Sequence, residues 1–155
     1  MFKKILVPLD GSKLAAKVLP KVTELAKACK SQVTLVHVCH TEQMGEAPGS
    51  VLAAAVEQEK KVCQTFLSQA AKEVEGAGIK VDFTCVEGVP AREIIGYADK
   101  NNYDLIAMAT HGRGEVAWVL GSTAEKVVSH ATVPVLLFRV IEFKPPLLKE
   151  EFFLP

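Results

Sequence analysis

The sequence lacks an excess of charge of either sign. Its 155 residues include 18 Lys and Arg against 18 Asp and Glu, so the formal net charge is zero, and 49% of the residues are hydrophobic. A chain this apolar, with no net charge, is not intrinsically disordered. The missing basic excess also removes the electrostatic attraction on which general nucleic-acid binding depends, so we predict no nucleic-acid partner.

Long hydrophobic runs are also missing. The longest mostly apolar stretch, residues 131–141, contains Pro134 and Arg139 and is too short to span a bilayer. The apolar segment 5–9 near the N-terminus is too short for the core of a signal peptide, and it ends at Asp10. We therefore expect a cytoplasmic protein with no membrane partner.

Closely spaced cysteines are absent as well. The four cysteines lie ten or more residues apart and form no Cys-x-x-Cys pair; they are Cys29, Cys39, Cys63 and Cys85. Zinc sites usually contain closely spaced ligand pairs, and disulfide frameworks are typical of small secreted chains. The spacing therefore predicts four reduced thiols.

One local group of metal-ligating residue types is present, namely His37, Cys39 and His40. In a strand, His37 and Cys39 would point to the same face of the sheet. A metal ion would need further ligands, and the sequence nominates none. We therefore predict no metal site.

The chain alternates between two hydrophobic patterns. Continuous or alternating apolar runs predict strands at residues 5–9, 33–38, 81–86, 105–109 and 133–138. Apolar residues at three- and four-residue spacing predict helices at about 14–30 and 51–75, another from Pro90, and a last one from Ser122. This order is typical of a single α/β domain with a five-stranded parallel sheet and helices on both of its faces.

Two local features refine these helices. Pro20 lies inside the first predicted helix and should kink it or remove one hydrogen bond. Ser122 is followed three residues later by Glu125, which matches a capping box at the start of the last helix.

The loops after the strands form the candidate site, because ligands of such sheets bind beyond the carboxyl ends of the strands. These loops contain neither the G-x-G-x-x-G fingerprint nor a P-loop motif. Asp10 could instead accept hydrogen bonds from ribose or hold a hydrated metal, although it could equally be a turn residue. Gly112 and the segment 121–123 could bind an anion at a helix N-terminus, although Ser122 could be a simple N-cap.

Four segments together resemble the universal stress protein family. They are residues 5–12 (ILVPLDGS), 35–38 (LVHV), 87–91 (EGVPA) and 109–122, which begins with ATHGR and ends with GS. The resemblance covers residues 2–140. It implies an adenine nucleotide alpha-hydrolase-like fold with strand order 3-2-1-4-5, a cytoplasmic location and a homodimer. Residues 1–141 would form the domain, and residues 142–155 a C-terminal tail outside it.

The resemblance also implies a ligand, since many family members bind ATP or AMP, with magnesium accompanying ATP. Their motif after the fourth strand is G-x2-G-x9-G-[ST]. Here the first glycine is replaced by Ala109, and eight residues instead of nine separate Gly112 from Gly121. A second branch of the family does not bind nucleotide.

Transferred to this sequence, the family pattern gives each site residue a role. Pro8 and Asp10 would lie near adenine and ribose, and Val38 against adenine. Met108 and Ala109 would line the base and the ribose. The phosphates would be held by Gly112, Gly121, Ser122 and Thr123.

No catalytic residue is predicted, because His111 has no carboxylate partner nearby in the sequence. The function expected is that of a stress-response sensor or switch that binds an adenine nucleotide and hydrolyses ATP weakly at most. The alternative is a dimeric scaffold that binds no nucleotide and acts through a protein partner. An enzyme of adenylate chemistry is a third hypothesis, but the sequence shows no nucleophile for it.

The predicted homodimer would form through the strand Val133–Ile141. This strand is nearly uncharged, and the family order places it at an edge of the sheet, where an open apolar strand invites uncontrolled pairing. The apolar residues 152–154 at the end of the tail should dock on the dimer or on a protein partner.

Overall fold

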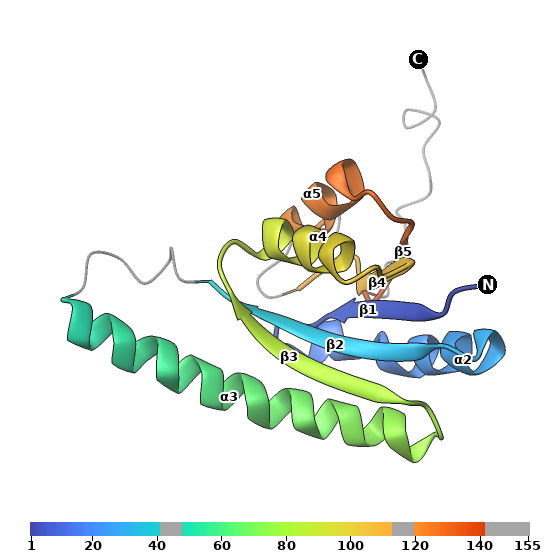
Figure 1. Cartoon of the computed structure of the whole chain (residues 1–155), viewed down its shortest axis with the longest axis horizontal. Helices are drawn as coiled ribbons and strands as arrows, with labels where there is room; N and C mark the ends of the chain where they lie inside the picture. Colours follow the sequence, from blue (N-terminus) through green and yellow to red (C-terminus); the bar gives the residue numbers. More distant parts are fainter. Residues whose placement is uncertain (41–47, 113–119, 142–155) are drawn as a thin grey trace.

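Five parallel strands form one sheet in the order β3-β2-β1-β4-β5, which confirms the predicted fold (Figure 1). The computed structural model describes residues 1–40, 48–112 and 120–141. The strands are β1 (Lys4–Pro8), β2 (Gln32–Cys39), β3 (Val81–Glu87), β4 (Leu105–Ala109) and β5 (Val135–Phe138). The helices are α1 (Lys13–Ala16), α2 (Leu19–Cys29), α3 (Gly49–Gly76), α4 (Pro90–Lys100) and α5 (Ser122–His130).

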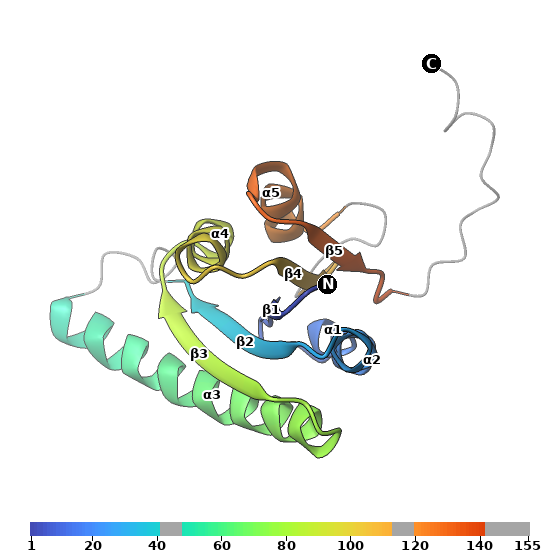
Figure 2. The same cartoon turned by 45° about the vertical axis from the view of Figure 1, so that its right-hand side comes forward.

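The sheet separates two hydrophobic cores. Helices α1, α2 and α3 cover one face, and α4 and α5 cover the other (Figures 1 and 2). Neighbouring strand residues alternate between the cores, so Ile5 and Val7 belong to the first and Leu6 to the second. Strands buried on both faces need apolar residues at successive positions, and this explains the continuous runs of β1 and β4.

Pro20 divides the first predicted helix into two. Helix α1 ends at Ala16, and Pro20 lies in the first turn of α2. A proline in a first turn removes no intrahelical hydrogen bond, because the N–H groups there have no partner within the helix. The predicted kink in one helix was therefore wrong.

Two of the four cysteines form a disulfide, so the prediction of four reduced thiols was wrong. Cys63 of α3 is bonded to Cys85 of β3, with a Cα–Cα distance of 6.4 Å. Among the residues that the structure describes, Cys29 and Cys39 are the free thiols. The partners lie 22 residues apart in sequence, and only the docking of α3 on the sheet brings them together.

Strand β5 lies at the edge of the sheet, where it pairs with β4 from Val135 to Phe138. It is shorter than the predicted strand, which began at Val133. Leu136 is exposed, and the neighbouring strand residues are half-buried. The predicted tail, residues 142–155, lies outside the described residues.

The helices of residues 1–40, 48–112 and 120–141 include none with the length and apolar composition needed to cross a bilayer. Helix α3 has 28 residues, but charged side chains interrupt its apolar pattern in the segments 57–61 and 72–75.

Candidate functional site

A cavity of about 380 Å³ lies at the carboxyl ends of the strands. Its walls come from the segments that follow β1, β2, β3 and β4 and from the start of α5. All the site residues predicted from the sequence line this one cavity: Pro8, Asp10, Val38, Met108, Ala109, Gly112, Gly121, Ser122 and Thr123. The parallel topology brings them together, because every strand ends at the same edge of the sheet.

Asp10 and Gly112 meet at the centre of the site, one after β1 and the other after β4. The Asp10 carboxylate accepts a hydrogen bond from the backbone N–H of Ser12, with an N–O distance of 2.9 Å. Its other oxygen lies so close to Gly112 that a Cβ atom there would collide with it. Asp10 is therefore a turn residue and a cavity residue at the same time, and any side chain at position 112 would require the Asp10 carboxylate to move.

The N-terminus of α5 opens toward the cavity. Gly121 is its N-cap, and the backbone carbonyl of Gly121 accepts a 2.8 Å hydrogen bond from the N–H of Glu125. The predicted capping box was wrong by one residue, because Ser122 is the first helical residue and no side chain caps the helix. The first N–H groups of a helix lack intrahelical partners and carry partial positive charge, which is the environment an anion requires.

The opposite part of the cavity is apolar. Val38, Met108 and Ala109 are buried at the ends of β2 and β4, and Pro8 is buried at the end of β1. These side chains offer apolar surface rather than hydrogen bonds. An aromatic ring would bury apolar surface against it.

The cavity wall also contains residues to which the sequence analysis gave no binding role, among them Lys126 and His111. Lys126 lies four positions after Ser122 on α5, and among the described residues it is the only Lys or Arg that lines the cavity. Its spacing of one helical turn from Ser122 was a signal that the sequence already contained. His111 is buried, and its Nδ1 lies 2.8 Å from the hydroxyl oxygen of Thr110.

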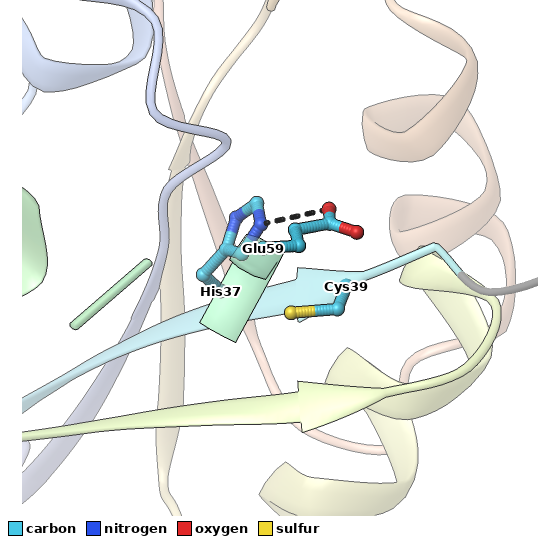
Figure 3. Close-up of side chains that lie close together, drawn as sticks. All are labelled: His37, Cys39 and Glu59. Atoms are coloured by element: carbon cyan, nitrogen blue, oxygen red, sulfur yellow. Dashed lines mark ion pairs between the residues drawn. The ribbon is translucent and has the colours of Figure 1, made fainter. Parts of the chain in front are cut away.

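A second group of polar side chains lies beside the cavity (Figure 3). His37 and Cys39 come from β2, and Glu59 comes from α3. The His37 Nε2 atom is 3.8 Å from the Glu59 Oε1 atom. Of the three, His37 and Glu59 also line the cavity.

Comparison with known proteins gives the family. The model of the universal stress protein family matches residues 1–139. The chain belongs to the universal stress protein family. A curated relative, Universal stress protein MJ0531 of Methanocaldococcus jannaschii, is 33% identical over 141 residues, covering 90% of this chain and 83% of the relative.

Solved structures of universal stress proteins share the fold. Protein MJ0577 of M. jannaschii superposes with a TM-score of 0.85 at 28% identity, covering 92% of this chain and 99% of that chain. A universal stress protein in complex with cAMP has a TM-score of 0.65 at 19% identity, over 90% and 98% of the two chains. One from Archaeoglobus fulgidus in complex with dAMP has a TM-score of 0.60 at 19% identity, over 88% and 97%.

Proposed function

We propose that this protein binds an adenine nucleotide, ATP or AMP, in the cavity at the carboxyl ends of its strands and acts as a stress-response sensor or switch. The observation that carries the proposal is the placement of the Asp10 carboxylate against Gly112, in a cavity that the N-terminus of α5 also lines. Universal stress proteins of the same fold in complex with cAMP and dAMP support it.

Each part of the cavity suits one part of such a ligand. The apolar wall around Val38 and Met108 would take the adenine ring, and Asp10 would accept hydrogen bonds from the ribose hydroxyls. Gly121, Ser122 and Thr123 would present backbone N–H groups to the phosphates. A magnesium ion accompanying ATP would be neutralised in part by the same Asp10 carboxylate.

The phosphate side also determines which nucleotide is preferred. Eight residues separate Gly112 from Gly121, one fewer than in the family's nucleotide motif. A backbone N–H must approach a phosphate oxygen to about 2.7–3.2 Å, so a loop shorter by one residue redirects several donors. We expect AMP to bind more tightly than ATP, and ATP hydrolysis to be weak at most.

Calorimetry of the purified chain with AMP, ATP and GTP tests the proposal. Heat of binding with AMP and ATP, together with none for GTP, supports adenine-nucleotide binding. An absence of heat with all three nucleotides at millimolar concentration, with the protein folded, would assign the chain to the scaffold branch, which acts through a protein partner.

The quaternary arrangement is part of the same proposal. An edge strand with the exposed Leu136 and half-buried apolar neighbours needs a cover, and pairing of Val133–Ile141 across a twofold axis provides one. Sedimentation at micromolar concentration should show a dimer. The cytoplasmic location is proposed from the family resemblance, and the division into a domain of residues 1–141 and a tail of residues 142–155 likewise remains a proposal.

A further inference from the structure

Three side chains bring donor atoms of different elements close together, and they belong to His37, Cys39 and Glu59. The ring nitrogens of His37, the Cys39 sulfur and a Glu59 carboxylate oxygen provide one atom each, and these atoms all lie within 4.8 Å of one another. Figure 3 shows the three side chains close together near the end of β2, with a dashed line between the His37 ring and the Glu59 carboxylate. The sequence had singled out His37, Cys39 and His40 and predicted no metal site, whereas in the structure α3 contributes Glu59 as the third group.

The histidine is already oriented to act as a ligand. Its Nδ1 atom lies 2.8 Å from the backbone carbonyl oxygen of Leu9. A carbonyl can only accept, so Nδ1 donates the hydrogen bond, and Nε2, which faces Glu59, is the ring atom positioned toward a metal ion. Metal-binding histidines typically donate their other N–H to a carbonyl or carboxylate in this manner. The ring is further held by an edge contact with Phe66, with ring centroids 5.1 Å apart.

We propose that His37 Nε2, Cys39 Sγ and the Glu59 carboxylate bind a divalent metal ion of the zinc class. Nitrogen, sulfur and oxygen donors together suit Zn²⁺ better than Mg²⁺ or Ca²⁺, which prefer oxygen ligands. Three protein ligands leave the fourth tetrahedral position open for water or a ligand group. This site does not depend on nucleotide binding.

The distances require only a small closure around an ion. Zinc bonds of about 2.0–2.3 Å in a tetrahedron separate neighbouring donor atoms by about 3.3–3.6 Å. The His37 and Glu59 atoms are already 3.8 Å apart. All three donor atoms lie within 4.8 Å of one another, so the closure amounts to about 1.5 Å at most. The Glu59 side chain is 32% exposed and is free to move, whereas Cys39 is fixed in the buried strand.

Binding of an ion requires the Cys39 thiol to lose its proton. Metal binding would displace the thiol proton to solvent and form a sulfur–metal bond. The resulting thiolate and the Glu59 carboxylate together balance the two positive charges of the ion. Glu87 is engaged by Lys60 and is not needed as a ligand.

The location places the ion at the cavity. His37 and Glu59 belong to the cavity wall, while Cys39 lies behind it in the sheet. An ion held by these three side chains would therefore lie in the cavity wall. Its fourth coordination position would be available to a ligand bound in the cavity.

Zinc titration of the purified full-length chain against a chromophoric chelator tests the site, with no nucleotide present. Substitution of Co²⁺ adds a spectroscopic readout, because a bound cysteine sulfur gives a sulfur-to-cobalt charge-transfer band. Glu59→Gln should weaken zinc binding by about tenfold or more, since even changes outside the ligand set cost about 10- to 100-fold. Cys39→Ala should abolish the cobalt band.

Matched controls separate the site from general surface binding. Glu57→Gln makes the same chemical change on an exposed residue of the same helix, and Cys29→Ala removes the other free thiol. Both variants should keep the zinc affinity and the cobalt band. No zinc binding by a folded chain overturns the proposal. So does an affinity that Glu59→Gln leaves unchanged, or a cobalt complex without a sulfur band.

Discussion

The Cys63–Cys85 disulfide makes a quantitative prediction about stability. The bridge closes a loop between residues 22 positions apart, from the middle of α3 to β3. In the chain-entropy description, closing a loop of this length removes about 11 cal/mol/K from the unfolded chain, or about 3.4 kcal/mol at room temperature. Reduction of the bridge should therefore lower the free energy of unfolding by about 3 kcal/mol, a substantial part of a typical total of about 5–15 kcal/mol.

Urea unfolding, followed by circular dichroism with and without a phosphine reductant, measures this difference. Reduction retains both sulfur atoms, so it leaves no cavity beside the fully buried Cys63. The double variant Cys63→Ala/Cys85→Ala serves as the control, because its stability should not respond to the reductant. Thiol titration in denaturant should find two thiols in the oxidised protein and all four after reduction.

Two results would refute the reasoning. Four reactive thiols in protein purified without reductant would mean that the bridge does not form. A bridge that forms, but whose reduction changes the free energy of unfolding by less than about 1 kcal/mol, would mean that loop entropy does not govern its effect.

Three further predictions concern other parts of the molecule. Gly112→Ala should weaken adenine-nucleotide binding in calorimetry because its Cβ displaces the Asp10 carboxylate, whereas Gly96→Ala, which has open space around it, should bind as the wild type does. Tyr103→Phe should cost about 1–2 kcal/mol at neutral pH in urea unfolding, because it removes the buried 2.7 Å hydrogen bond to Thr34. Burial raises the pKa of Tyr103, so wild-type stability should be retained below pH about 10 and fall above it, and the variant should lose less there. Leu136→Asp should convert the proposed dimer to a monomer in sedimentation without unfolding it, since Leu136 is exposed on the edge strand; a dimer that persists would place the interface elsewhere.

The sheet was predictable from the sequence because burial on both faces leaves little choice of residue. Strand β4 has the predicted bounds, Leu105–Ala109, since five consecutive buried positions require an uninterrupted apolar run. The cavity was predictable for a topological reason. Once the strands are parallel, the segments after β1 and β4 must meet, and Asp10 and Gly112 do.

Helix starts were less predictable, because neighbouring residues compete for them. Ser122 and Glu125 satisfy the capping pattern, yet the backbone of Gly121 takes the N-cap position, where its N–H also donates to the carbonyl of Thr110 at 2.9 Å. That hydrogen bond ties the helix to the end of β4. A tertiary contact, absent from any local pattern, decides where α5 begins.

The two features that the sequence did not predict, the disulfide and the third ligand of the proposed metal site, have a single structural cause. Helix α3 buries a stripe of residues against the sheet, namely Cys63, Leu67, Ala71 and Val74. Glu59 precedes Cys63 by one helical turn and so continues this stripe, which places its carboxylate beside β2, where the side chain is only partly exposed. A carboxylate in line with an apolar stripe was the signal available in the sequence. The register in which α3 docks determines both which strand Cys63 reaches and which side chains Glu59 meets, so the disulfide anchors the same part of the helix that carries the ligand.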